Sequence, residues 1–147
     1  MEEFEQIEIL LVEDNPLDAE LTMTALKSGN VANSITWVKD GEEALEYLFR
    51  TGRYADRGEA QPRLVFLDLK MPKVNGIEVL EAVKGDARTR RIPVVVMTSS
   101  QEESDVAKTY DLGVNSYVVK PMDFQTLAEV TCKAGYYWLA INRSVPG

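Results

Sequence analysis

Short apolar runs that end in polar residues constrain the fold of this chain more than any other feature. Runs that are apolar almost throughout and rich in Val, Ile and Leu are typical of buried parallel strands. Four such runs occupy residues 7–12, 64–67, 93–97 and 117–119. The polar residues that follow them are Glu13, Asp14, Asp68, Thr98 and Lys120. Because parallel strands end at one edge of a sheet, where open α/β folds bind ligands, these five side chains are predicted to share one site.

Helical patterns separate the apolar runs, and a further apolar run at 35–38 follows the first helix. Asn15 and Pro16 supply an N-cap and a first helical residue, and Gly29 lies where the first helix should end. Three later helix starts pair a capping residue with a glutamate three positions on. These pairs are Asp40 with Glu43, Asn75 with Glu78, and Ser100 with Glu103. A fifth helix is expected from about 123 to 141.

This alternation predicts an α/β fold, a doubly wound (βα)5 flavodoxin-like sandwich. Short right-handed crossovers favour a five-stranded parallel sheet of order 2-1-3-4-5, with the first and third strands adjacent. Each helix should place an apolar stripe on the sheet. In the fourth helix that stripe is predicted to be Val106, Ala107 and Tyr110.

Composition narrows the possible functions. A length of 147 residues fits one domain, expected to span 1–147 with a core of about 6–141, a short tail at 142–147 and no output domain. The net charge of −8 disfavours nucleic acid and anionic membranes as partners. The single Cys132 cannot form an internal disulfide, and no signal peptide or long apolar span is seen, so a cytoplasmic location is expected. The absence of histidine excludes a Ser-His-Asp triad, and any phosphohistidine must lie on another protein.

Three carboxylates at one sheet edge need a cation. Two like charges about 4 Å apart cost about 4 kcal/mol at an effective dielectric near 20, and Lys120 supplies only one positive charge. Oxygen ligands suit Mg²⁺, with Mn²⁺ possible, and carboxylate-bound Mg²⁺ usually implies phosphate. Asp68 would then be the nucleophile that accepts a phosphoryl group, while Lys120 and Thr98 offset charge on its oxygens.

Four motifs in order resemble the response-regulator receiver domain, the CheY-like phosphoacceptor of two-component systems. They are LLVEDN at 10–15, LDLKMPKVNG at 67–76, VVMTSS at 95–100 and YVVKP at 117–121. The resemblance implies that Asp68 takes a phosphoryl group from a sensor histidine kinase. It further implies that Glu13, Asp14, Asp68 and the Lys70 backbone carbonyl hold the metal. The domain would be a signalling module that catalyses only its own phosphorylation and dephosphorylation.

The resemblance also assigns a conformational switch. Thr98 would move toward the phosphoryl group and Tyr117 would turn inward, although Thr98 could simply bond the next helix and Tyr117 could pack at the sheet edge. Lys120 would clamp the phosphoryl oxygens, and its bond to Pro121 would be cis. Lys70 and Ser100 flank the site, where they could affect the lifetime of the phosphorylated form.

Residues 50–63 form a longer connection than the simplest family members have. A solvated loop and a partner contact are both open, and the GRYA segment at 52–55 resembles stand-alone regulators that partner bacterial phytochrome kinases. An Mg²⁺-dependent phosphatase is a second function class, but it needs an acid-base aspartate where Lys70 stands. A receiver-like scaffold would not need Asp68, Thr98 and Lys120 together, and no glycine-rich nucleotide loop is present.

The last helix carries more apolar residues than one sheet can cover. Leu127, Val130, Ala134, Tyr137 and Ile141 are predicted on one face, with Tyr136, Trp138 and Leu139 elsewhere. Such an excess favours an interface, so a homodimer through the fourth helix, fifth strand and last helix is expected. The alternative is that Tyr136 and Trp138 fold back over the end of the sheet.

Overall fold

The computed structural model describes residues 8–32, 34–58 and 60–142. Its strands are β1 (Glu8–Val12), β2 (Ser34–Val38), β3 (Leu64–Leu67), β4 (Val94–Thr98) and β5 (Ser116–Val119). Its helices are α1 (Pro16–Ser28), α2 (Gly41–Phe49), α3 (Gly76–Lys84), α4 (Glu103–Asp111) and α5 (Phe124–Tyr136). A 3₁₀ turn, η1 (Gly52–Tyr54), and a π-helical turn, η2 (Tyr137–Ile141), complete the described part.

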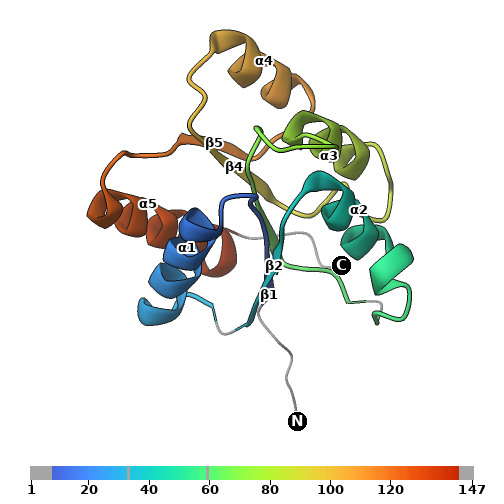
Figure 1. Cartoon of the computed structure of the whole chain (residues 1–147), viewed down its shortest axis with the longest axis horizontal. Coiled ribbons are helices and arrows are strands. Elements are labelled where there is room, and N and C mark those ends of the chain that lie inside the picture. Colours follow the sequence, from blue (N-terminus) through green and yellow to red (C-terminus); the bar gives the residue numbers. More distant parts are fainter. Residues whose placement is uncertain (1–7, 33, 59, 143–147) are drawn as a thin grey trace.

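The five strands form one parallel sheet of order β2-β1-β3-β4-β5, which confirms the predicted architecture. Helices α1 and α5 lie on one face, and α2 and α3 on the other, with α4 beyond them near β5 (Figure 1). Successive side chains of a strand point to opposite faces, so Leu10 and Val12 join the core beneath α2 and α3, whereas Ile9 and Leu11 face α1 and α5. No helix in the described ranges is long and apolar enough to cross a membrane.

Helix caps follow the predicted pattern in three of four cases. Asn15 accepts from Leu17 N at 2.9 Å, Asp40 accepts from Glu43 N at 2.8 Å, and Asn75 forms a reciprocal capping box with Glu78. The prediction for Ser100 was wrong, because α4 begins only at Glu103 and has no side-chain cap. The Ser100 hydroxyl donates instead to a carboxylate, a stronger acceptor than a neutral group.

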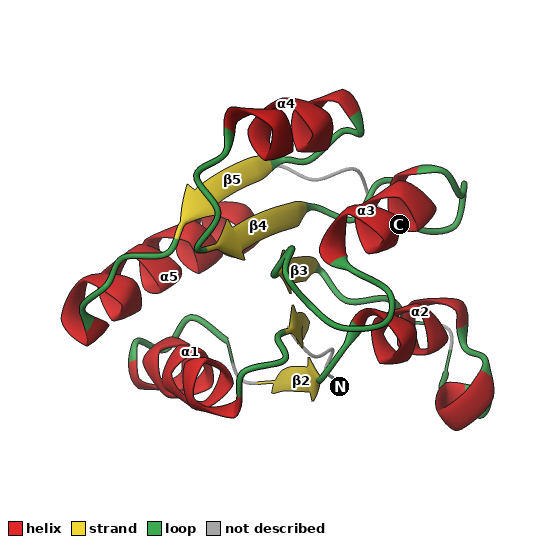
Figure 2. Cartoon of the chain, turned by 45° about the horizontal axis from the view of Figure 1, so that its top comes forward, coloured by secondary structure: helices red, strands yellow, loops and turns green. Residues whose placement is uncertain are grey.

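The predicted stripe of α4 was also wrong in part. Ala107 and Tyr110 are exposed and Val106 is half-buried, whereas Thr109 is the one buried residue of this helix. The Thr109 hydroxyl donates to the Val106 carbonyl at 2.9 Å, which satisfies it within the helix. Figure 2 shows α4 beside the edge strand β5, where a narrow contact suffices and a full apolar stripe is not required.

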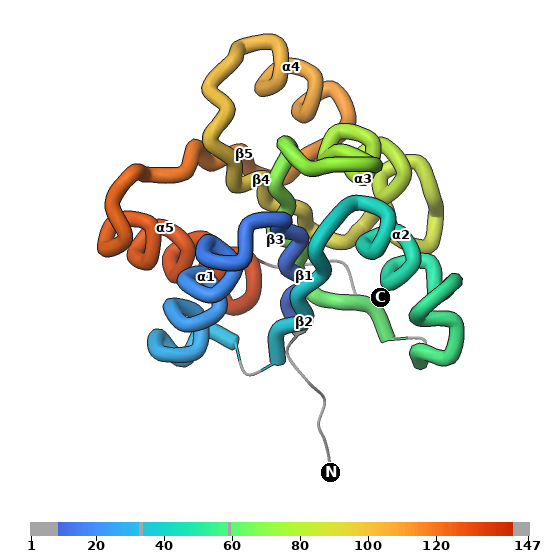
Figure 3. Tube along the Cα trace, in the orientation of Figure 1, coloured from blue at the N-terminus to red at the C-terminus, as the bar shows by residue number. Residues whose placement is uncertain are grey.

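The described part of the 50–63 connection is folded against α2 and is not a freely solvated loop (Figure 3). The Arg57 guanidinium lies 4.1 Å from the ring centroid of Tyr47 and donates to the Tyr47 carbonyl at 2.8 Å. The Tyr54 hydroxyl donates to Glu43 at 2.6 Å, while its ring contacts Tyr47 edge-on. Cation–π stacking and these hydrogen bonds therefore hold the segment on its own domain.

The end of the last helix differs from the predicted helical faces. The π turn shifts the register, so Leu139 is buried, whereas Tyr137 and Ile141 are 46% and 60% exposed. Trp138 folds back on the sheet and donates from Nε1 to the Ser116 hydroxyl at 3.2 Å. The face assignment of Tyr137 and Ile141 was therefore wrong, and the folding-back alternative holds for Trp138.

Candidate functional site: an acidic cluster at the carboxyl edge of the sheet

Three carboxylates converge at the carboxyl ends of β1 and β3, as predicted. Each of Glu13, Asp14 and Asp68 offers an oxygen, and these oxygens lie within 4.8 Å of one another. The convergence follows from register, because Val12 pairs with Leu67 and the residues after them are brought side by side. The Asp68 amide donates to the Val12 carbonyl at 3.1 Å, which extends the ladder into the site.

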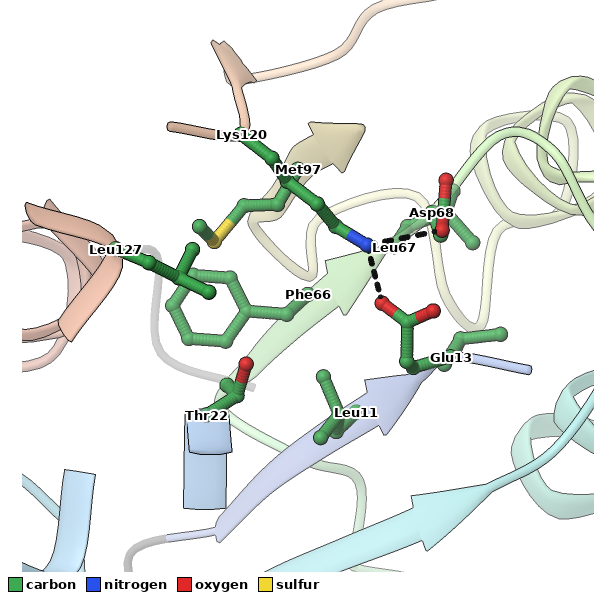
Figure 4. A pocket seen from close by; sticks show the side chains of 10 residues that line it. Leu11, Glu13, Thr22, Phe66, Leu67, Asp68, Met97, Lys120 and Leu127 are labelled. Carbon is green, nitrogen blue, oxygen red and sulfur yellow. Dashed lines mark hydrogen bonds and ion pairs between the residues drawn. The ribbon is translucent and has the colours of Figure 1, made fainter. Parts of the chain in front are cut away.

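Lys120, after β5, reaches across the sheet edge to this cluster. Its Nζ lies 2.7 Å from Glu13 Oε1 and 3.2 Å from Asp68 Oδ2 (Figure 4). It also donates to Asp18 Oδ2 at 3.1 Å. Sequence reasoning missed Asp18, although its place on α1, four residues after Asp14, would have been a usable signal. The peptide bond before Pro121 is trans, contrary to the resemblance and in line with the preference of about 0.5–1 kcal/mol for trans X–Pro bonds.

Negative charge exceeds positive charge at this edge of the sheet. Burial raises the pKa of Glu13 to about 7, and the nearby Asp68 adds to that effect, although Lys120 opposes it. Burial alone would lower the pKa of Lys120, but its hydrogen bond to Glu13 and the charge of Asp68 outweigh burial and raise it. Among the described residues, the Lys120 ammonium pairs with three carboxyl groups, Glu13, Asp18 and Asp68, and the carboxyl group of Asp14 lies in the same cluster. A hard cation with oxygen ligands fits this surplus of negative charge.

Thr98 and Tyr117 meet at Ser100 and not at the acidic cluster. Thr98, fully buried, accepts from the Ser100 amide at 3.3 Å. The Tyr117 hydroxyl donates to the Ser100 carbonyl at 3.0 Å, and its ring is half-buried. Both contacts agree with the simpler alternatives, a bond from Thr98 to the segment before the next helix and packing of Tyr117 at the sheet edge. The loop from β4 to α4 therefore connects the two residues.

Trp37, which sequence reasoning also missed, holds the backbone of the site from β2. Its indole Nε1 donates to the Glu13 carbonyl at 2.7 Å, while the Glu13 amide donates to the Val38 carbonyl at 3.1 Å. Two hydrogen bonds to β2 thus hold the backbone of Glu13, where the turn toward Asp14 begins. Groups that orient ligands in this way commonly affect metal affinity.

Replacing Trp37 by phenylalanine is expected to weaken the binding of a divalent cation about five-fold, the effect of losing one hydrogen bond worth about 1 kcal/mol. Phenylalanine keeps an aromatic ring in the β2 position. Calorimetric titration with Mg²⁺ measures the effect, and Trp138→Phe is the matched control because its indole bonds Ser116 away from the site. Equal affinities for the two variants would contradict a role of Trp37 in the site.

Gly76 allows the loop after β3 to fold back on the strand end. A Cβ at this position would lie 2.3 Å from the Asp68 carbonyl oxygen and 2.6 Å from the Leu69 Cα, closer than atoms can pack. The Gly76 amide donates to the Leu69 carbonyl at 3.0 Å, which closes the loop. A side chain here would therefore displace the backbone of Asp68.

We expect Gly76→Ala to lower the free energy of unfolding by about 2–3 kcal/mol, because overpacking forces backbone shifts. Urea denaturation measures this change. Gly58→Ala is the control, since a Cβ there meets nothing within 4 Å. A loss no greater than that of the control would show that the loop adjusts freely.

A cleft of about 450 Å³ opens beside the cluster. It is lined by Asp14, Leu69, Lys70, Met71, Pro72, Asn75, Ile77 and Asp105. A much smaller cavity, about 10 Å³, lies between the buried side of the cluster and the apolar side chains of Phe66, Met97 and Leu127 (Figure 4). Of the two, the cleft is the one with room for a ligand beside the carboxylates.

The fold and its acidic edge define a class of protein, the receiver domain of two-component signalling. Residues 9–131 match the family model described as the response regulator receiver domain. The chain belongs to this family, a family of signalling domains and not of conventional enzymes, which confirms the resemblance drawn from the four motifs.

Particular relatives cover nearly the whole chain. The probable methanogenesis regulatory protein FilR2 of Methanothrix harundinacea is 44% identical over 139 residues, which span 95% of this chain and 87% of FilR2. The phosphorylated cyanobacterial phytochrome response regulator RcpA is 37% identical, with a TM-score of 0.90 over 97% of this chain and all of RcpA. The Mn²⁺-bound form of response regulator Rcp1 is 34% identical, with a TM-score of 0.88 and the same coverage. Rcp1 comes from Synechocystis.

Proposed function

We propose that this chain accepts a phosphoryl group on Asp68 from the phosphohistidine of a sensor histidine kinase. The observation that carries the proposal is the buried Asp68 carboxylate, grouped with Glu13 and Asp14 and 3.2 Å from the Lys120 ammonium. A carboxylate oxygen of Asp68 attacks phosphorus, the phosphorus–nitrogen bond breaks, and its electron pair stays on the imidazole of the donor. Because this chain has no histidine, that donor is another protein.

Asp14, Asp68 and the Lys70 backbone carbonyl would bind Mg²⁺ directly, with Glu13 acting through water because its Oε1 is paired with Lys120 at 2.7 Å. When bound, the cation neutralises charge on the transferring phosphoryl group. Similarity to the Mn²⁺-bound Rcp1 supports a divalent cation here, with Mn²⁺ as a substitute. Lys120 would hold the phosphoryl oxygens on the opposite side.

Thr98 and Tyr117 would transmit the phosphorylation state. Their shared contact with Ser100 supports this proposal, since a move of the Thr98 hydroxyl to the phosphoryl group would break the bond from the Ser100 amide. The Tyr117 hydroxyl donates to the carbonyl of this same residue, Ser100. Output would then pass through protein contacts on the face of α4 and β5.

Intact mass spectrometry after incubation with a small phosphodonor and Mg²⁺ tests the assignment of Asp68. The wild type should gain one phosphoryl adduct and Asp68→Asn should gain none. Asp111→Asn, an exposed aspartate at the end of α4, is the matched control and should be labelled normally. An undiminished adduct on Asp68→Asn, or none on the wild type, would overturn the proposal.

An exposed apolar surface beside the site fits the kinase helix that carries the phosphohistidine. It consists of Leu17, Met122 and Phe124, which are 55%, 100% and 61% exposed. The bond from Lys120 to Asp18 brings the start of α1 and the turn before α5 together around the cluster. Phe124→Asp should block phosphotransfer from a kinase that labels the wild type. The same variant should still be labelled by a small phosphodonor. Loss of labelling by both donors would contradict this docking surface.

A bacteriophytochrome kinase is the partner favoured by the GRYA segment and by similarity to the phytochrome regulator RcpA. Reconstitution with a purified bacteriophytochrome kinase tests this pairing. Transfer to this chain at a rate far below transfer to the kinase's own regulator would exclude it. The comparison with the kinase's own regulator is needed because FilR2, a relative named for the regulation of methanogenesis, is also similar to this chain.

We further propose a homodimer through α4, β5 and the end of α5. Tyr136, Tyr137 and Ile141 are 55%, 46% and 60% exposed at the end of α5, and Tyr110 is 53% exposed on α4. Sedimentation of the wild type and of a Tyr136→Asp, Ile141→Asp variant tests this interface, with Leu17→Asp as a control on another surface. The double variant should be monomeric, and a monomeric wild type would end the proposal.

A further inference from the structure

Lys70 lies at the entrance of the acidic site, but its ammonium points to a carboxylate outside the cluster. Its Nζ is 3.7 Å from Asp105 Oδ2 on the first turn of α4. Both residues line the cleft that Asp14 also borders. The Lys70 amide donates to Asp68 Oδ1 at 3.2 Å, so the side chain begins directly beside the cluster. The Lys70 ammonium is therefore within reach of two sets of carboxylates, that of Asp105 and those of the acidic cluster.

Asp105 is the fixed member of this pair. Its Oδ2 accepts from the Ser100 hydroxyl at 2.6 Å, and Ser100 is buried. The Asp105 side chain is 22% exposed, whereas the Lys70 side chain is 60% exposed. A charge-assisted hydrogen bond to a buried hydroxyl thus anchors the carboxylate, while the lysine can leave it.

The charges at the sheet edge favour such a departure. The Lys120 ammonium pairs with Glu13, Asp18 and Asp68, and Asp14 lies in the same cluster. Without a partner elsewhere, a second ammonium on a flexible stem would be drawn to Asp14 and Asp68. An ammonium in that position would occupy the oxygens that a divalent cation needs.

We propose that Asp105 is a positioning residue that holds Lys70 away from Asp14 and Asp68 and so keeps the acidic cluster accessible to a divalent cation. This inference rests on the proposed metal site and adds a determinant of its affinity. It explains why the end of α4 nearest the site carries a carboxylate although the site already has an excess of negative charge. Because Ser100 anchors Asp105, the loop that contacts Thr98 and Tyr117 also controls where Lys70 lies.

The test is a double-mutant cycle in which Mg²⁺ affinity is measured by calorimetric titration at low ionic strength. The proteins are the wild type, Asp105→Asn, Lys70→Met and the double variant. Asparagine can still accept from Ser100, so Asp105→Asn removes mainly the charge that holds Lys70. In the wild-type background this variant should weaken Mg²⁺ binding about three- to five-fold, the range that an exposed ion pair of up to about 1 kcal/mol allows.

In the Lys70→Met background, Asp105→Asn should change Mg²⁺ affinity far less. An equal loss in both backgrounds would overturn the inference, because Asp105 would then act on the cation by its charge alone. No loss in the wild-type background would overturn it as well. Absence of Mg²⁺ binding by every protein would instead contradict the proposed metal site, so the two failures are distinguishable. Ser100→Ala removes the hydroxyl that anchors Asp105 but keeps the charges of Asp105 and Lys70. This variant should also weaken Mg²⁺ binding.

Discussion

Replacing Lys120 by methionine is expected to lower the free energy of unfolding in chelator by about 3 kcal/mol, the lower end of the range for breaking a buried ion pair. The Lys120 side chain is 14% exposed, and those of Glu13 and Asp68 are 5% and 9% exposed. Methionine has a similar length but leaves these two carboxyl groups without a cation. Urea denaturation of both proteins with and without Mg²⁺ measures the effect.

The matched control is Lys133→Met, because Lys133 is exposed on α5. The Lys133→Met substitution should change the free energy of unfolding by no more than about 0.5 kcal/mol, as most surface substitutions do. Mg²⁺ should restore part of the stability of Lys120→Met by supplying the missing positive charge. Asp68→Asn in the same background should restore part of it in chelator, since it removes one of the unpaired charges. A loss equal to that of Lys133→Met would show that Lys120 is not the cation that stabilises this edge.

The sequence predicts this fold and the central carboxylates because both depend on local patterns. Apolar runs define the strands, parallel pairing brings their ends to one edge, and Glu13, Asp14 and Asp68 follow without further information. Capping by Asn15 and Asn75 is equally local, since a side chain bonds an amide three or fewer residues away. The excess of negative charge indicated a hard cation and a phosphoryl acceptor, and the family resemblance added the Lys70 carbonyl, the switch residues and the kinase partner.

Errors arose where tertiary contacts decided between local options. Ser100 could cap α4 but bonds Asp105, and the start of the helix moves to Glu103. A wider helical turn at the end of α5 buries Leu139 in place of its neighbours. Trp37 joins the site only because β2 lies next to β1, a contact between residues 24 positions apart. Such contacts depend on the packing of whole elements and have no signature in a short segment.

Asp68→Asn is expected to change stability in opposite directions with and without metal. In chelator it should raise the free energy of unfolding by about 1 kcal/mol, because it removes one like charge from an under-neutralised cluster. Lys120 keeps its bonds to Glu13 at 2.7 Å and to Asp18 at 3.1 Å, so the ammonium stays paired. Thermal and urea unfolding in chelator measure this gain.

With Mg²⁺ present, the order should reverse. A wild type with Mg²⁺ at 100 times its dissociation constant gains about 2.7 kcal/mol, and a variant that binds ten-fold more weakly gains about 1.4 kcal/mol. At still weaker binding the gain of the variant approaches zero, so the wild type gains about 2.7 kcal/mol more, which exceeds the advantage of about 1 kcal/mol that the variant has in chelator. Asp111→Asn controls for the general effect of lost negative charge and should follow the wild type in both conditions. Equal Mg²⁺-dependent stabilisation of the wild type and Asp68→Asn would remove Asp68 from the metal site, whereas a lower stability of Asp68→Asn in chelator would show that its bond to Lys120 outweighs the repulsion.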